Sequence, residues 1–292
     1  MLSLALPKGS LEGPTLALLE AADLALRRGS SRDYHGRIDD ARIERVSLLR
    51  PQEIPLFVQD GFFDLGVTGR DWVVETGVDV VELAGLDYAR SGTGQRVRIV
   101  LAVAVDHPAA CAAELAPGSR ISTEYPNLTQ GFFQRLGRPM RVFPSYGATE
   151  AKVPGIVDAI VDVTETGSTL RAHGLRVIET LLESEVLLVA GRAAAADPER
   201  RTAMDDLATI LTGALRAQGR VLLKLNVGES ELQTVLAALP SMKAPTVSPL
   251  AGALAYAVES VVEKAQVNTL IPRLRAAGAT DLLELPIRKI IP

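Results

Sequence analysis

The sequence is poor in the residues that build disulfides, metal sites and membrane spans. Its 292 residues contain one cysteine and three histidines. A lone Cys111 excludes an internal disulfide and any multi-cysteine metal site, and its alanine-rich surroundings predict a small apolar residue on a helix face. No uncharged apolar run approaches the ~20 residues that span a bilayer. Residues 1–6 are apolar, but Pro7 follows without a basic leader, which favours a strand over a signal peptide. We therefore expect a cytoplasmic protein with no membrane partner.

The sequence also lacks an excess of positive charge and the common catalytic signatures. Lys+Arg total 31 against Asp+Glu 35, giving a net charge of -4, which argues against a nucleic-acid-binding protein. Only six basic residues are lysines. The remaining arginines favour bidentate contacts to carboxylate or phosphate, although codon bias gives the same excess. We find no Ser/His/Asp or Cys/His set, P-loop or dinucleotide fingerprint. The histidines have no ligand spacing, so no protein-bound metal is expected.

Short apolar runs alternate with helical patterns along most of the chain. Its length suits two domains of about 150 residues, with three smaller ones possible. Strand–helix–strand alternation predicts an α/β fold with largely parallel sheets that helices cover on both faces. Strands are expected at residues 3–6, 46–49, 65–68, 78–83, 97–105, 120–123, 140–143 and 157–163. Helices are expected at residues 11–28, 51–59, 70–76, 126–136, 149–153 and 198–218.

The apolar run at residues 97–105 divides this α/β region into two lobes. Residues 90–94 resemble a flexible crossing between them. We expect residues 1–94 and 183–215 to form lobe I and residues 95–182 to form lobe II. A chain that returns to its first lobe leaves a cleft between the two, where small-molecule sites are common.

From residue 216 to 292 the pattern changes to a smaller module. Strands at 220–226, 244–249, 255–262 and 281–285 and helices at 230–239 and 264–277 give the order βαββαβ, which is the ferredoxin-like unit. Gly278 falls where a helix end favours a left-handed residue. We expect a third, separate domain.

The strongest local signal is a buried strand that ends in acidic residues, Asp162 and Glu165, and runs into a Thr-Gly-Ser-Thr turn. Backbone N–H groups at the start of the following helix, with the hydroxyls of Thr166, Ser168 and Thr169, form an anion site. Gly167 would let a phosphate approach the backbone. Asp162 or Glu165 could then accept hydrogen bonds from sugar hydroxyls. Plain helix capping explains the Ser and Thr residues equally well; the preceding acids favour a site.

A similar but weaker pattern follows residue 64, where a strand runs into Thr-Gly and then a helix with Asp71 in its first turn. An acid there is stabilised by the helix dipole whether or not a ligand binds. Lys8, Arg32, Arg50 and Glu124 fall near expected strand ends, where open α/β sheets bind ligands. Each of the charged residues could instead be a solvated surface group.

Several segments together resemble the long form of the ATP phosphoribosyltransferase family. The matching segments are LPKG at 6–9, LRP at 49–51, DLGVTGRDWV at 64–73, ISTEYPNL at 121–128, FPSYGATEAKV at 143–153, DAIVDVTETGSTL at 158–170, APTVSPL at 244–250 and ELPIRKIIP at 284–292. They cover essentially the whole chain.

The resemblance implies a catalytic part like a type II periplasmic binding protein, followed by a regulatory ACT-like domain. The family joins N1 of the ATP adenine to C1 of phosphoribosyl pyrophosphate and releases pyrophosphate, in the first step of histidine biosynthesis. Magnesium would be carried mainly by the substrate phosphates. By this likeness the 162–169 turn holds the ribose and its 5′-phosphate.

The resemblance also assigns roles to individual residues. Lys8, Arg50, Asp71 and Glu124 would line the nucleotide side, and Arg32 and Arg50 would meet the departing pyrophosphate, with Lys8 beside them in the catalytic set.

Histidine would bind the C-terminal domain as a feedback inhibitor, at Asn226, Met242 and Thr246, in a homo-oligomer that switches between dimer and hexamer. Two residues depart from the family: Ser10 stands where an arginine is usual, and Asn226 where some members have an acid. The alternatives are a cytoplasmic two-lobed sensor or binding protein, and an amino-acid sensor whose catalytic half is inactive.

Overall fold

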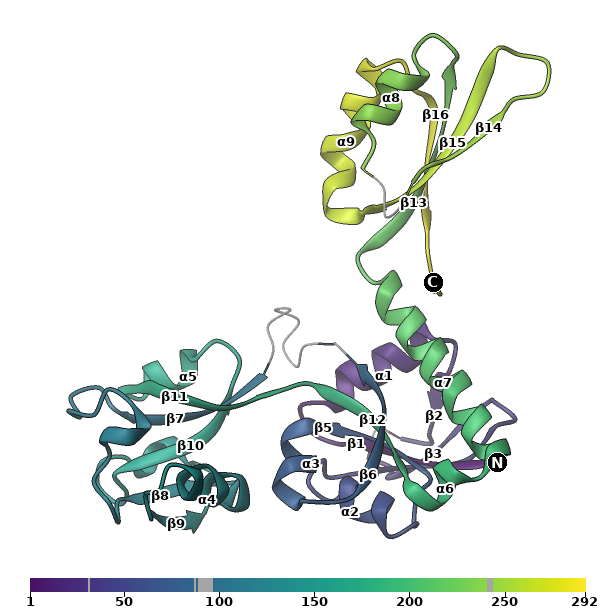
Figure 1. The fold of residues 1–292 in the computed structure, drawn as a ribbon. Helices are drawn as coiled ribbons and strands as arrows, with labels where there is room; N and C mark the ends of the chain where they lie inside the picture. The colour runs from purple at the N-terminus through teal and green to yellow at the C-terminus, as the bar shows by residue number, and fades with distance from the viewer. Residues whose placement is uncertain (31, 87, 89–96, 241–243) are drawn as a thin grey trace. The chain divides into compact units, whose positions relative to one another are not determined.

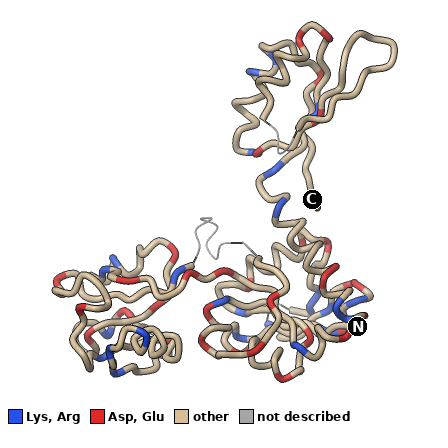
Figure 2. Tube along the Cα trace, in the orientation of Figure 1, with Lys and Arg blue, Asp and Glu red and all other residues tan. Residues whose placement is uncertain are grey.

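The computed structural model describes all residues except 31, 87, 89–96 and 241–243, so the expected crossing at 90–94 and Met242 lie outside the described residues. The chain divides into two compact units, 1–208 and 209–292 (Figure 1). The division falls inside the long helix α7 (Pro198–Ala217), whereas the sequence placed it at residue 216. Acidic and basic side chains are interspersed along both units (Figure 2). No helix in the described part of the chain is long and apolar enough to cross a bilayer.

The first unit contains two sheets that correspond to the two expected lobes. Lobe I has the strand order β2-β3-β4-β1-β5-β12-β6. Its strands are β1 (Leu2–Pro7), β2 (Leu26–Arg27), β3 (His35–Ile38), β4 (Ile43–Leu49), β5 (Leu65–Gly69), β6 (Val80–Leu86) and β12 (Val186–Gly191). Its helices are α1 (Glu12–Ala21), α2 (Ile54–Gln59), α3 (Arg70–Thr76) and α6 (Arg192–Ala196). The chain returns from lobe II as β12, antiparallel between β5 and β6, which confirms the two-lobed α/β architecture.

Lobe II is built on the strand order β11-β7-β10-β8-β9. Its strands are β7 (Val97–Ala104), β8 (Arg120–Thr123), β9 (Arg141–Pro144), β10 (Ala159–Thr164) and β11 (Leu175–Ser184). Its helices are α4 (Pro126–Arg135), α5 (Ser168–Ala172) and the 3₁₀ turns η1 (Ala112–Glu114) and η2 (Glu150–Lys152). Strands β9, β8 and β10 are mutually parallel, so their carboxyl ends share one edge.

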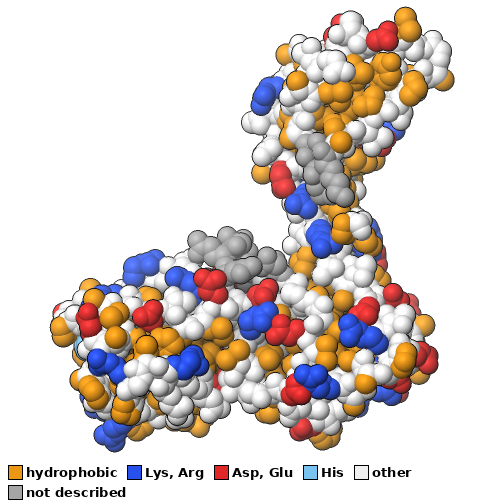
Figure 3. All heavy atoms as spheres, viewed as in Figure 1, with side chains coloured by type: hydrophobic (Ala, Val, Ile, Leu, Met, Phe, Trp, Pro, Cys, Tyr) orange, Lys and Arg blue, Asp and Glu red, His pale blue; other side chains and the backbone are white. Residues whose placement is uncertain are grey.

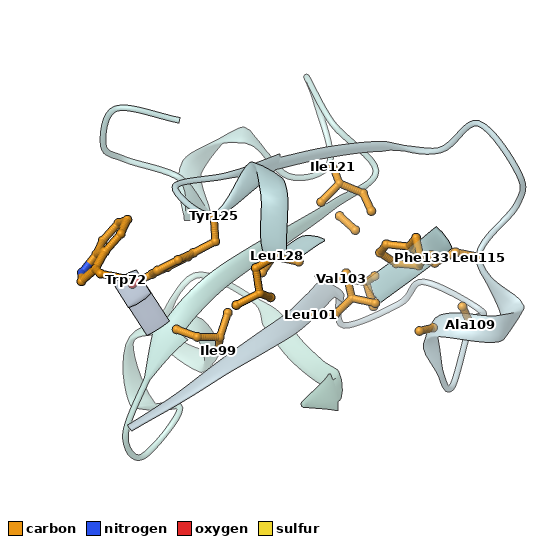
Figure 4. Close-up of a cluster of buried hydrophobic side chains, with 13 residues drawn as sticks. Trp72, Ile99, Leu101, Val103, Ala109, Leu115, Ile121, Tyr125, Leu128 and Phe133 are labelled. Atoms are coloured by element: carbon orange, nitrogen blue, oxygen red, sulfur yellow. The ribbon is translucent and has the colours of Figure 1, made fainter. Parts of the chain in front are cut away.

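Part of the apolar core of lobe II comes from lobe I. Trp72 on α3 belongs to the same buried cluster as Tyr125, Leu128 and Phe133 of lobe II. Figure 4 shows Trp72 at one end of that cluster, next to Tyr125. The two rings stack with centroids 4.5 Å apart and planes 28° apart, within the range for aromatic pairs. Helix α3 therefore packs into both lobes.

The second unit is the ferredoxin-like module that its sequence order predicted. Its elements are β13 (Arg220–Gly228), α8 (Leu232–Ala238), β14 (Thr246–Pro249), β15 (Ala255–Glu263), α9 (Lys264–Ala276) and β16 (Thr280–Pro286). The sheet is antiparallel in the order β14-β15-β13-β16. One face packs on α8 and α9 through alternate residues of β13 and β15. Figure 3 shows apolar side chains gathered on the visible face of this unit.

Gly278 ends α9 as the sequence predicted. Its φ is +102°, and the Ala279 N–H donates to the Leu274 carbonyl over 3.0 Å. This is the hydrogen bond of a left-handed helix stop, and glycine adopts that conformation without a Cβ penalty.

Three sequence-based expectations for local structure were wrong. The helix expected at 11–28 stops at Ala21, because Asp23 takes the left-handed conformation (φ 63°) and the Leu24 N–H closes on the Leu19 carbonyl over 2.8 Å. Cys111 has extended backbone (φ -147°) before η1 rather than a place on a helix face. The helix expected at 149–153 is the single turn η2.

Candidate functional site

The Thr-Gly-Ser-Thr turn lies between β10 and α5, at the carboxyl edge of the lobe II sheet. Gly167 has φ +73°, a left-handed conformation that side chains disfavour, and a Cβ there would lie 3.0 Å from Arg171 Nη1. The turn borders a cavity of about 560 Å³. Its lining residues are Glu150, Asp162, Val163, Thr164, Glu165, Thr166, Ser168, Thr169 and Leu170. The structure thus brings five of the six predicted turn residues to one cavity.

Hydroxyl groups of the turn already accept two of its backbone amides. The Gly167 N–H donates to Thr164 Oγ1 over 2.8 Å in a buried bond, so this amide does not face solvent as the sequence suggested. The Ser168 N–H donates to Thr166 Oγ1 over a longer 3.3 Å, and the Thr166 and Ser168 hydroxyls lie 2.9 Å apart. Thr166, Ser168 and Thr169 are exposed. An incoming anion could therefore replace the weaker, exposed bond while Thr164 keeps the turn in shape.

Burial perturbs the carboxyl group of Asp162. Its pKa is raised to about 6, chiefly because burial disfavours the charged carboxylate. The Val163 N–H, which donates to Asp162 Oδ1 over 2.7 Å, lowers the pKa. The negative charges of Glu150 and Glu124 raise it, and Lys152 lowers it. At neutral pH Asp162 is mostly ionised and ready to accept hydrogen bonds.

Lys8 and Arg50 lie together at the carboxyl edge of the lobe I sheet. Strands β1 and β4 are parallel with Pro7 opposite Leu49, so the two cations follow neighbouring strand ends. The Lys8 N–H donates to the Leu49 carbonyl over 2.7 Å, and its ammonium lies 4.0 Å from the centroid of the Tyr34 ring. Arg32, two residues before Tyr34, is exposed, as is Arg50. The Lys8 ammonium and the exposed Arg50 guanidinium form a basic edge suited to phosphate.

Asp71 occupies a different environment from the one its sequence pattern suggested. Its exposure is 0%. Its carboxylate accepts the Tyr125 hydroxyl over 2.8 Å and the Ser184 hydroxyl over 2.6 Å, and its own N–H donates to Ser184 Oγ over 3.0 Å. Glu124, next to Tyr125, is exposed. Asp71 thus fixes the turn that carries Glu124 rather than lining an open surface itself.

Sequence reasoning missed Glu75, one helical turn beyond Asp71. This carboxylate is 7% exposed and accepts the N–H groups of Asn127 and Leu128 over 3.0 and 2.9 Å, so an acid of lobe I caps helix α4 of lobe II. The pKa of Glu75 is raised above its usual value because burial disfavours the charged carboxylate, and the two amides offset part of this shift. The i, i+4 spacing of two acids on α3 was the available signal, because it places both on one helix face.

In the second unit, the expected histidine-site residues share the sheet face opposite α8 and α9. Asn226 lies opposite Ala257, and Thr246 lies opposite Glu259, two residues further along β15. Asn226 Nδ2 donates to Asp281 Oδ2 over 2.9 Å. The Lys224–Glu259 ion pair, at 2.9 Å, occupies the row of Thr246. Asn226 and Thr246 thus share a sheet face with this ion pair and with the exposed Leu283 and Leu285.

Comparisons with known proteins decide the family. A family model described as ATP phosphoribosyltransferase matches residues 50–213. A second, described as the C-terminal domain of HisG, matches residues 217–289. A protein from Pelotomaculum thermopropionicum named ATP phosphoribosyltransferase is 47% identical over 293 residues, covering 100% of this chain and 99% of that protein. The chain belongs to the ATP phosphoribosyltransferase family.

Further relatives agree with this membership. An ATP phosphoribosyltransferase from Desulforudis audaxviator is 46% identical, over 100% of this chain and 99% of its own. Among solved structures, a chain of the ATP phosphoribosyl transferase (HisG:HisZ) complex from Thermotoga maritima matches with a TM-score of 0.62 and 25% identity, over 74% of this chain and 99% of that one. The C-terminal domain makes this chain a long-form ATP phosphoribosyltransferase, a transferase of histidine biosynthesis. The sensor alternative is not favoured.

Proposed function

We propose that the turn from Asp162 to Leu170 binds the ribose 5-phosphate part of phosphoribosyl pyrophosphate, and that N1 of the ATP adenine attacks C1 of this sugar as pyrophosphate leaves. The observation that carries the assignment is the cavity of about 560 Å³ that this polar turn borders at the edge of three parallel strands. Ligands of open α/β sheets bind at that edge.

The exposed hydroxyls of Thr166, Ser168 and Thr169 are suited to the 5′-phosphate. A phosphate oxygen would take the place of Thr166 Oγ1 at the Ser168 N–H, where the existing bond is 3.3 Å long. The left-handed Gly167 leaves the approach to the backbone clear of a Cβ. Arg171, whose Nη1 donates to the Thr166 carbonyl over 3.0 Å, stiffens the turn and adds positive charge.

Asp162 is suited to the ribose hydroxyls. With its pKa near 6, it is an ionised acceptor at pH 7, and charge-assisted hydrogen bonds are stronger than neutral ones. Glu165 lines the same cavity and could accept a second hydroxyl. Below pH 6 Asp162 takes up a proton and loses acceptor capacity, so substrate affinity should fall.

Lys8, Arg32 and Arg50 are suited to the pyrophosphate that leaves. Adenine N1 is a neutral nucleophile with no proton to lose before attack, so no strong general base is needed. The reaction requires two positioned substrates and stabilisation of the charge that develops on pyrophosphate. The basic edge of lobe I supplies the positive charge that stabilises pyrophosphate. The exposed Glu124 would line the nucleotide side, and Asp71 holds its turn in place through the hydrogen bond with Tyr125.

Magnesium would reach the site on the substrate phosphates. Within the described residues, no group of three or more His, Cys, Asp or Glu side chains is placed to hold a metal ion. Mg²⁺ usually keeps several waters and binds substrate phosphates rather than a protein cage. When bound, the cation would neutralise part of the pyrophosphate charge.

Histidine and self-association are proposed for the C-terminal unit. The amide of Asn226 and the hydroxyl of Thr246 lie on one sheet face and could hold an amino acid. A neutral amide at residue 226 would bind the histidine ammonium with less charge assistance than an acid would. Feedback inhibition and a dimer–hexamer exchange would then act through this unit, in the cytoplasm.

The test is the absorbance of the phosphoribosyl-adenine product when ATP, phosphoribosyl pyrophosphate and Mg²⁺ are mixed with the protein. We expect turnover, and for the variant Thr166→Val/Ser168→Ala a KM for phosphoribosyl pyrophosphate at least about tenfold higher, since several phosphate hydrogen bonds are lost. Thr269→Val, on the exposed surface of α9, is the matched control. Substrate-induced closure without product would instead favour a binding protein.

A further inference from the structure

An ammonium and three buried hydroxyls form a cluster at the carboxyl ends of β8 and β9. Lys152 Nζ donates to Ser145 Oγ over 2.6 Å and to Ser122 Oγ over 3.3 Å. Ser145 Oγ is also 2.7 Å from Thr149 Oγ1. The three hydroxyl residues are 2–5% exposed. None of these four residues lines the cavity itself, so the cluster would act through its neighbours.

The cluster joins strand ends that lie side by side. Ser122 is on β8, and Ser145 directly follows β9, its N–H donating to the Thr123 carbonyl over 2.7 Å. Strand β10 runs parallel to β8 with Val161 opposite Thr123, so Asp162 leaves the same edge. Lys152 therefore ties the segment after β9 to the edge that carries Asp162.

The charges around this edge are unbalanced without Lys152. Three carboxylates are near Asp162 or share its cavity: Glu150 on η2, Glu124 after β8 and Glu165 in its own turn. On the other side, β7 places Arg98 opposite Thr164, which lies two residues beyond Asp162 on the same face of β10. Lys152 is the cation whose charge acts directly on Asp162 and favours its ionised form. Like charges in a partly buried site oppose ionisation, and an ammonium offsets this effect.

We propose that Lys152 is a positioning residue for phosphoribosyl pyrophosphate: its ammonium holds the ends of β8 and β9 through Ser122 and Ser145, and supplies the positive charge opposite Asp162 and Glu150. Asp162 then meets the ribose hydroxyls as an ionised acceptor in a fixed place. Lys152 does not touch the substrate, and the ATP side of the reaction does not depend on it.

The experiment compares pH profiles of kcat/KM for phosphoribosyl pyrophosphate in the wild type, Lys152→Met and Lys152→Arg. Removing the charge raises the pKa of Asp162 further, so the acidic limb of Lys152→Met should move to higher pH. At pH 7 its kcat/KM should fall about tenfold, mainly through KM, while KM for ATP changes less than about twofold. Lys152→Arg should restore the wild-type limb. Lys264→Met, at the exposed start of α9, is the matched control.

A second variant separates the tether from the charge. Ser145→Ala removes the shortest bond to Lys152 but keeps the ammonium, so KM for phosphoribosyl pyrophosphate should rise about threefold with the acidic limb in place. If Lys152→Met does not fold, this variant and Lys152→Arg decide the matter.

The inference rests on the proposed function, and the two can fail separately. A wild type without turnover would overturn the proposed function. A working wild type whose Lys152→Met profile overlays it, or a Ser145→Ala variant with unchanged KM, would overturn the role of Lys152 alone.

Discussion

The turn after β5 and the turn after β10 share a pattern but not an environment. Each follows a buried strand with Thr-Gly and then a helix. At Gly69 the backbone has φ -82°, and the Asp71 carboxylate lies so close that a Cβ would overlap it. At Gly167 the backbone is left-handed, and the hydroxyls that follow face a cavity. In the first turn the Asp71 carboxylate is buried in hydrogen bonds with lobe II. In the second turn the hydroxyls of Thr166, Ser168 and Thr169 remain exposed.

The largest expected effect is that of Gly167→Val on activity. A valine must adopt φ +73° with its Cβ 3.0 Å from Arg171 Nη1, and its branch crowds the phosphate approach. We expect kcat/KM for phosphoribosyl pyrophosphate to fall about 100-fold or more, since misplacement by about 1 Å costs that much. The left-handed penalty should cost only about 1–2 kcal/mol of unfolding free energy. Steady-state kinetics and urea unfolding give both numbers. Unchanged apparent affinity for phosphoribosyl pyrophosphate would refute the phosphate site at this turn.

Asp71→Ala should show the opposite balance. It leaves the buried hydroxyls of Tyr125 and Ser184 without their acceptor, so the free energy of unfolding should fall by about 3 kcal/mol. Urea denaturation measures this loss. Asp60→Ala, at an exposed residue with an ordinary helical φ of -79°, is a control for removing an acid. A loss below about 1 kcal/mol would contradict the structural role of the first turn.

Asp162→Asn should make the protein more stable and less active. Because the folded-state pKa of Asp162, about 6, lies above its ordinary 3.8, the folded chain binds this proton more tightly than the unfolded chain. Stability therefore rises as pH falls from about 6 to 4, and ionisation at pH 7.5 costs free energy. The amide removes that cost, so we expect a gain of about 1 kcal/mol at pH 7.5 and little at pH 4. A variant less stable than the wild type at pH 7.5 would disprove the burial argument.

The smallest effect on catalysis is expected from the second unit. Thr246→Ala should leave turnover within about twofold of the wild type and weaken histidine inhibition about tenfold, since a hydrogen bond to a charged ligand is worth roughly 1.5 kcal/mol. Initial rates with increasing histidine measure both. Inhibition that matches the wild type would move the histidine site away from this sheet face.

The sequence predicted best where local signals suffice. Each element of the βαββαβ unit begins within two residues of its expected start, because alternation in strands and glycine at the end of α9 are local. The left-handed residue that ends α1, Asp23, was missed, since an aspartate at such a position has no distinctive signal in the sequence. Strand β11 was missed as well. Its register shifts near Glu179 and Leu182 interrupt the alternation of side chains between the two faces of the sheet, which is the sequence signal for a strand.

The candidate site divides in the same way. The Asp162–Thr169 turn could be found because its residues are consecutive and carry their chemistry together. The contacts of Asp71 with Ser184 and of Glu75 with Leu128 join residues 113 and 53 positions apart. Such pairs depend on how α3 packs against lobe II, and no local pattern encodes that packing. The same holds for Lys152, whose partner Ser122 lies 30 positions away.

A crystal structure with ribose 5-phosphate or phosphoribosyl pyrophosphate bound tests the account most directly. We expect the 5′-phosphate within hydrogen-bond distance of the Ser168 N–H and the hydroxyls of Thr166 and Thr169, with a ribose hydroxyl on Asp162. A phosphate bound elsewhere, with this turn unchanged and still closed on its own hydroxyls, would contradict it.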